Sequence, residues 1–310
     1  MSSKRSNRRR IVMASAAGLV LLLGVGSYTV AGAANPWHDR GGRERPATST
    51  PAPSPSTTPA DENQNSADVT LPPANGQFDY QIGGAYEPAT GVEIVDRDRE
   101  AEPAAGKYNI CYVNAFQTQP GDAEYWTGEQ DDLLLKNADG EYVRDSEWDE
   151  YILDTSTEAK REALAGIVGE WIDGCAAAGF DAVEPDNLDT YTRSDELLTK
   201  DDNVAFSALL AQRAHEAGLA IAQKNTAELD QNDARTAGFD FAIAEECQVW
   251  KECDAYTDIY GDQVYEIEYT DNGRSAYATA CKSQGQDISV ILRDRDVVPA
   301  GKSAYHYQAC

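Results

Sequence analysis

Apolar residues recur at helical spacing in two long segments of the chain. In residues 158–178 this spacing predicts an amphipathic helix. Its apolar face would contain Leu164, Ile167, Val168, Trp171, Ile172 and Cys175. Ser156 or Thr157 can cap the start of this helix, and Gly179 can end it. The same pattern predicts a second helix over residues 203–217, which Gly218 would end.

Nine short apolar segments before, between and after these helices have the composition of strands. They are residues 80–83, 92–96, 108–114, 151–154, 180–186, 219–225, 239–245, 264–269 and 288–293. Because strands and helices alternate, we expect an α/β fold, a parallel sheet closed as a (β/α)8 TIM-type barrel. One candidate is then surplus, and we place it near the N-terminal end. An open doubly wound sheet is the alternative, but the sequence lacks its glycine-rich phosphate loop.

The N-terminal part of the chain differs from the rest in composition. Residues 1–34 begin with basic residues, continue with a long apolar run and end in small residues, which is typical of an export signal. The run is long enough to span a bilayer, so an uncleaved anchor is the alternative. Residues 35–75 are a Pro/Ser/Thr-rich linker that we expect to be disordered. We predict a secreted or extracellular protein with one folded domain over residues 76–310, tethered to a membrane or cell wall if the signal is retained.

An even number of cysteines in an exported chain predicts disulfides. The pairing that we prefer is Cys247–Cys253, Cys281–Cys310 and Cys111–Cys175. The first closes a short loop, the second ties down the last residue, and the third is what remains; other pairings stay open. There is no C-x-x-C pair, and the three histidines are scattered, so we expect no metal site. We also expect no organic cofactor.

The formal net charge of −27 excludes non-specific binding to nucleic acid. Two explanations of this acidity remain equally open. It is typical of a soluble extracellular protein, and it would also attract a cationic partner.

Polar residues collect at the C-terminal ends of the predicted strands, where the active site of such a barrel lies. In the segment 179–189, Glu184 and Asp186 share one face of a strand with Ala182. The strand ends as a whole carry Asp96, Asp98, Asn114, Asp154, Glu184, Asp186, Lys224, Asn225, Glu245, Glu246, Glu268 and Asp294. This pattern predicts a polar, mostly anionic mouth.

The candidate chemistry narrows to carboxylates. The sequence contains no phosphate-binding loop of the P-loop type and no G-x-S-x-G nucleophile elbow. Paired carboxylates together with aromatic residues are what glycoside hydrolysis needs, one acid donating a proton and the other acting as base or nucleophile.

Six segments resemble those of glycoside hydrolase family 114, which contains endo-α-1,4-polygalactosaminidases. The segments are residues 79–86, 108–120, 179–189, 222–225, 239–247 and 267–269. The resemblance covers residues 78–310. It implies a (β/α)8 barrel that cleaves within α-1,4-linked galactosamine or N-acetylgalactosamine polymers.

The resemblance implies that Asp186 and Glu245 are the catalytic carboxylates. Simple alternation along residues 239–247 instead places Glu246 in phase with the small residues Ala242 and Ala244, and a bulge would reconcile the two. Lys224 is expected to neutralise part of the cluster; if it keeps Asp186 ionised, Glu245 is the acid. A structural ion pair is the alternative for this lysine. The motif leaves both the identity of the acid and the stereochemistry open.

We expect the substrate to be a cationic or N-acetylated galactosamine polysaccharide and the protein to be a monomer. The predicted substrate contacts are Asp96, Tyr112, Asp154, Glu184, Lys224, Asn225, Glu246, Glu268 and Asp294. Two other functions remain open. One is hydrolysis of another amino-sugar polymer, and the other is a wall-associated barrel that binds glycan without turnover.

Overall fold

The computed structural model describes residues 69–119 and 121–310. The predicted export signal and most of the predicted linker lie outside the described residues. Thr70, Pro72 and Pro73 already contact the barrel, because their carbonyl oxygens accept hydrogen bonds from Tyr108 and Tyr265. In the part of the chain that is described, no helix is both long enough and apolar enough to cross a membrane.

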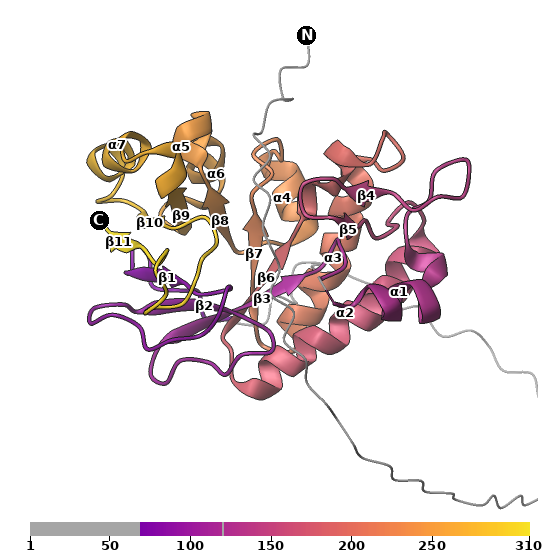
Figure 1. Cartoon of the computed structure of the whole chain (residues 1–310), viewed down its shortest axis with the longest axis horizontal. Coiled ribbons are helices and arrows are strands. Elements are labelled where there is room, and N and C mark those ends of the chain that lie inside the picture. Colours follow the sequence, from indigo (N-terminus) through magenta and orange to yellow (C-terminus); the bar gives the residue numbers. More distant parts are fainter. Residues whose placement is uncertain (1–68, 120) are drawn as a thin grey trace, which may run out of the picture. The chain divides into compact units, whose positions relative to one another are not determined.

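The core of the molecule is one nine-stranded sheet with the order β1-β2-β3-β6-β7-β8-β9-β10-β11 (Figure 1). The first eight strands in this order pair in parallel, and they are β1 Phe78–Tyr80, β2 Ile94–Asp98, β3 Tyr108–Asn114, β6 Ala182–Asp186, β7 Ala220–Lys224, β8 Phe241–Glu245, β9 Val264–Tyr269 and β10 Ser289–Arg293. The last strand, β11 (Tyr307–Ala309), pairs antiparallel with β10. Side chains join β10 to the first strand, where Arg293 pairs with Asp79 at 3.2 Å. The predicted (β/α)8 barrel is confirmed as a nearly closed barrel.

The predicted long helices are confirmed. The helices are α1 Ala123–Glu129, α2 Glu158–Ala178, α3 Lys200–Glu216, α4 Gln231–Ala237, α5 Cys247–Trp250, α6 Cys253–Tyr260 and α7 Ser275–Ser283, with short 3-10 turns η1 Asp131–Leu133, η2 Leu188–Arg193 and η3 Thr270–Asn272. The Thr157 side chain accepts from the Lys160 amide at the start of α2, and Gly179 ends it in the left-handed region. The second long helix begins at Lys200 rather than residue 203, because Thr199 and Asp202 form a capping box.

The surplus strand candidate is residues 151–154, which lies later in the chain than we expected. These residues belong to an excursion between β3 and α2, not to the barrel. There β4 (Arg144–Asp145) pairs antiparallel with β5 (Glu150–Tyr151) in a separate small sheet. Ile152 and Leu153 are fully buried inside this excursion, which accounts for their strand-like apolar pattern.

The barrel interior explains why Glu245 needs no bulge to face inward. The buried interior cluster includes Phe241 and Ile243 of β8, while Ala242 and Ala244 pack in the outer cluster with α6 and α7. Glu245 is in phase with the two large residues. The expectation that small residues mark the interior holds for β6 and β7, but it is wrong for β8.

All three predicted disulfides are present. Cys111–Cys175 joins β3 to α2, Cys247–Cys253 closes the loop after β8, and Cys281–Cys310 ties the last residue to α7. Each therefore fixes a helix or a loop on the outside of the barrel, and the first two lie next to strands that end in the site described below.

Candidate active site

A buried lysine lies at the centre of the polar cluster. Lys224 is the last residue of β7, and its side chain is 1% exposed. Its Nζ lies 2.8 Å from Glu184 Oε1, 3.3 Å from Asp186 Oδ1 and 3.5 Å from Glu245 Oε2. It also donates to the Tyr80 hydroxyl at 2.9 Å, and this hydroxyl donates to Glu184. One cation thus contacts three carboxylates from the strands on either side of β7.

The inner layer of the cluster contains Asp96 and Glu184, both 0% exposed. Burial, reinforced by the charge of Glu184, raises the pKa of Asp96 well above its usual range. Neither Asp96 oxygen nor Glu184 Oε2 has another hydrogen-bond partner among the described residues. A proton on Asp96 satisfies this arrangement, because Asp96 then donates to Glu184. Asp96, Glu184 and Lys224 lie beneath the more exposed carboxylates of the cluster. They are too deeply buried to contact a polymer.

Asp186 belongs to the outer layer and ends β6. It accepts hydrogen bonds from the Tyr112 hydroxyl at 2.9 Å and from the Asn187 amide at 2.8 Å. Its side chain is 19% exposed. Solvent therefore reaches this carboxylate, whereas the tyrosine, the backbone amide and the lysine fix its orientation.

Glu245 is the second acid of the outer layer, with a side chain that is 25% exposed. It accepts from the Tyr269 hydroxyl and from Asn225 Nδ2, the latter at 2.9 Å. Burial opposes ionisation here, but the charge of Lys224 and the two hydrogen bonds lower the pKa of Glu245 below its ordinary value. Asn225 also accepts from the Glu245 amide, so one side chain orients both ends of this residue.

Glu246 lies beside this pair but is already paired. It leaves the strand with a φ of 61°, and its carboxylate contacts Arg295 and Asn272. The Arg295 guanidinium stacks on the Tyr269 ring at 4.1 Å. Glu246 therefore holds a cation against the tyrosine that hydrogen-bonds to Glu245.

Three predicted substrate contacts lie away from the cluster. Asp154 precedes α2 and pairs with Lys160. Glu268 points to the outer face of β9 and accepts from the Gln248 amide at 3.1 Å. Asp294 holds the C-terminal segment by accepting from the amides of Val298 and His306. These three acids of the predicted anionic mouth are thus dispersed over different parts of the fold.

Four residues near the carboxylates were not among the predicted contacts: Tyr80, Glu150, Tyr269 and Arg295. The two tyrosines lie in phase with the barrel interior, so alternation along β1 and β9 indicates them. Glu150 has no such signal, because it lies outside the barrel strands, in an acidic excursion whose local pattern does not distinguish it from a solvated segment. It is 8% exposed and accepts from Asn114 Nδ2 at 3.0 Å and Gln117 Nε2 at 2.9 Å. Burial raises its pKa to about 7.

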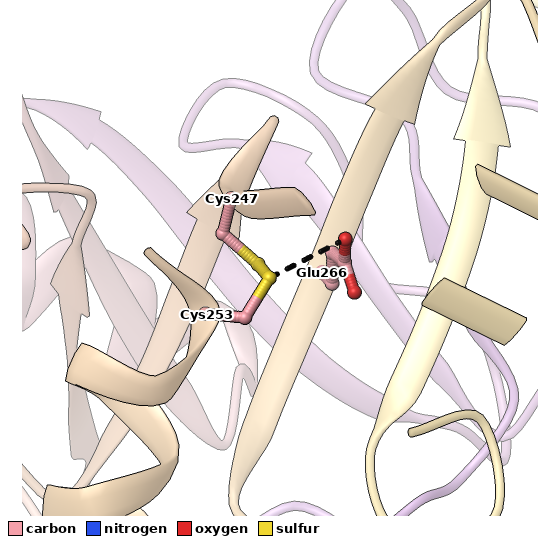
Figure 2. Close-up of side chains that lie close together, drawn as sticks. All are labelled: Cys247, Cys253 and Glu266. Carbon is pink, nitrogen blue, oxygen red and sulfur yellow. Dashed lines mark hydrogen bonds between the residues drawn. A yellow bond between two sulfur atoms is a disulfide. The ribbon is translucent and has the colours of Figure 1, made fainter. Parts of the chain in front are cut away.

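A second group of polar residues lies on the outer side of the barrel. Figure 2 shows the Cys247–Cys253 disulfide with Glu266 of β9 beside it. The two sulfur atoms and a carboxylate oxygen of Glu266, which are atom types that bind metals in proteins, lie within 4.8 Å of one another. Both sulfurs are bonded to each other and offer no thiolate to a metal. Burial and the neighbouring charge of Glu268 raise the pKa of Glu266 to about 8, so this acid can share a proton with Glu268.

A model of glycoside-hydrolase family GH114 matches residues 58–310. No curated protein sequence matches the chain. The crystal structure of Aspergillus fumigatus Ega3 in complex with galactosamine is 21% identical, covers 80% of this chain and 100% of that chain, and has a TM-score of 0.62. The glycoside hydrolase domain of PelA from Pseudomonas aeruginosa is 15% identical over 75% of this chain and 98% of that chain, with a TM-score of 0.48.

Proposed function

The chain belongs to glycoside hydrolase family GH114, and from this premise we propose that it is an exported endo-hydrolase of α-1,4-linked galactosamine or N-acetylgalactosamine polymers. The observation that carries the proposal is the pair of solvent-reachable acids, Asp186 and Glu245, held on one buried lysine at the C-terminal ends of the barrel strands. Ega3, which shares the fold, was crystallised with galactosamine, and this supports the class of sugar.

The proposed mechanism uses two carboxylates on either side of the glycosidic bond. One donates a proton to the leaving oxygen, and the other attacks the anomeric carbon or activates water. Tyr112 and Tyr269 fix the orientation of the two acids, and Lys224 limits the repulsion between them. Lys224, Tyr269 and Asn225 favour the charged form of Glu245 in the free protein, so it must take up a proton with bound substrate if it is the acid.

Conservative variants test this pair of acids. Asp186→Asn and Glu245→Gln keep the shape of each side chain and remove its acid–base chemistry. We expect kcat on α-1,4-galactosaminan to fall by about 10²–10⁴ in each variant, while binding of the polymer is retained. Asp189→Asn is the matched control, because this acid lies three residues after Asp186 and pairs with Arg193 on η2. Full activity in either carboxylate variant would contradict the mechanism.

The same variants separate a hydrolase from a glycan-binding barrel. A binding protein would retain polymer in a pull-down and release no reducing ends in any variant, including the unaltered protein. A hydrolase would release reducing ends only when both acids are present.

A further inference from the structure

Glu150 stands out among the buried acids because no cation is paired with it. Six other buried acids have a basic partner, in the pairs Asp79–Arg293, Asp294–Arg293, Asp145–Arg193, Asp154–Lys160, Glu184–Lys224 and Glu246–Arg295. Among the described residues, no lysine, arginine or histidine forms an ion pair with Glu150. Its hydrogen-bond partners are the neutral amides of Asn114 and Gln117.

Proton sharing does not explain this carboxylate. Asp96, Glu266 and Glu268 also lack a cation, but each is fully enclosed against another carboxyl group with which it can share a proton. Glu150 has no such partner. The acids that act on it through space, Asp186 and Asp145, add negative charge to its surroundings. An isolated buried carboxylate of this kind is costly while it is charged, and the cost is removed when it binds either a proton or a positive group.

The position of Glu150 links it directly to the catalytic cluster. Asn114, which donates to Glu150, ends β3 and lies opposite Asp186 in the register of β3 and β6. Asn187 donates to Asn114 Oδ1 at 2.9 Å, and its amide donates to Asp186. A short chain of hydrogen bonds thus runs from Glu150 to one of the proposed catalytic acids.

One oxygen of Glu150 remains available to a ligand. Both amide hydrogen bonds go to Oε2. Oε1 has no hydrogen-bond partner among the described residues. It is also not among the fully buried side-chain oxygens that lack a partner, so it contacts solvent. The two amides therefore hold the carboxylate through one oxygen and leave the second without a protein partner, in a residue whose charge is coupled to that of Asp186.

The geometry points to Glu150 as the residue that selects a galactosamine unit with a free, positively charged amino group on the Asp186 side of the site. This inference rests on the proposed function and adds to it the chemical form of the sugar. The ammonium group of such a unit supplies the cation that Glu150 lacks, in a charge-assisted hydrogen bond to Oε1. An N-acetylated unit is neutral and carries a bulkier group, so it gains nothing from this charge.

The test compares fully deacetylated and fully N-acetylated α-1,4-galactosamine oligomers as substrates. The quantity measured is the ratio of kcat/KM for the two, in the unaltered protein and in Glu150→Gln. Glutamine keeps an oxygen for Asn114 and Gln117 and removes the charge. We expect the preference for the deacetylated oligomer to fall by about tenfold to a hundredfold, the range given by one charge-assisted hydrogen bond. Glu147→Gln, in the exposed tip between β4 and β5, is the matched control and should keep the preference.

Each outcome decides the inference. Loss of preference in Glu150→Gln but not in Glu147→Gln supports it, and partial recovery in Glu150→Asp would add support, since aspartate restores the charge. Equal loss on both oligomers means that Glu150 only supports the fold of the excursion, and an unaltered protein without preference means that it selects nothing; both results overturn the inference but leave the hydrolase intact. If the unaltered protein cleaves neither oligomer, the result contradicts the proposed function, and with it the inference about Glu150.

Discussion

Removing the charge of Lys224 should destabilise the protein strongly and in a pH-dependent way. The substitution Lys224→Met keeps a long, unbranched side chain and deletes the ammonium group. Its Nζ is the cation closest to Glu184, and Asp186 and Glu245 also depend on it. In the variant, the enclosed carboxyls Glu184 and Asp96 must bind protons or remain as unpaired buried charges.

The separations set the size of the effect. At an effective dielectric constant of about 20, a charge pair 2.8 Å apart is worth roughly 6 kcal/mol, and pairs at 3.3 and 3.5 Å roughly 5 kcal/mol each. The cost of burying the lysine and the acids cancels much of this attraction. Breaking a buried ion pair by removing one partner costs about 3–5 kcal/mol, and we expect a loss in that range near neutral pH.

The direction with pH follows from Glu184. Burial already raises the pKa of Glu184 above its value in the unfolded chain, and loss of the lysine raises it further. The folded variant therefore holds a proton that the unfolded chain releases, and it loses stability as the pH rises through the folded pKa. At pH 5 the carboxyl is neutral, so less of the penalty remains than at pH 8.

Urea unfolding followed by circular dichroism at pH 5 and pH 8 measures this difference. We expect the gap in unfolding free energy between the unaltered protein and Lys224→Met to be larger at pH 8. Adding Glu184→Gln to the variant should restore part of the loss at pH 8, because it removes the buried charge. An equal loss at both pH values, or no restoration by the second substitution, would refute this account of the cluster.

Three further expectations follow from the same contacts. Tyr269→Phe removes a hydrogen-bond donor from Glu245, so the pKa of Glu245 should rise and the limb of the pH–rate profile that reports it should shift to higher pH. An unshifted profile would mean that this hydrogen bond does not control the titration of Glu245. Replacing both cysteines of Cys111–Cys175 with alanine should cost about 4 kcal/mol of unfolding free energy against about 2 kcal/mol for Cys247–Cys253, because the loops span 64 and 6 residues; equal losses in urea unfolding would contradict the loop-length argument. With a net charge of −27, kcat/KM on deacetylated polymer should fall between about 50 and 500 mM salt more steeply than on acetylated polymer, and a parallel decline would exclude an electrostatic contribution.

Local patterns in the sequence were sufficient to predict the barrel and the interior position of three charged residues at its centre. Alternation along β6 and β7 places Glu184, Asp186 and Lys224 on the interior face, and the structure brings them within hydrogen-bond distance. The helix caps Thr157 and Gly179 fix α2 in the same local way. These features depend on neighbours in sequence, which is why the pattern contains them.

The features that the sequence did not predict depend on packing between distant segments. On β8 the interior face is marked by large residues, because its neighbours β7 and β9 decide how much space is free there. Glu268 has the acidic character of a site residue, yet it faces the helices. Glu150 reaches Asn114 only through the folding of the excursion, across a separation of 36 residues. No local pattern encodes such contacts.

An endo-hydrolase of α-1,4-linked galactosamine polymers that depends on Asp186 and Glu245 is recognised by its products. The most direct test is product analysis by mass spectrometry after incubation of the disulfide-bonded protein with partly deacetylated α-1,4-galactosaminan, with chitosan as the control polymer. The account predicts a ladder of short galactosamine oligomers from the first polymer, none from chitosan, and none from either polymer with Asp186→Asn. Intact galactosaminan after incubation with the unaltered protein, or equal cleavage of chitosan, would contradict it.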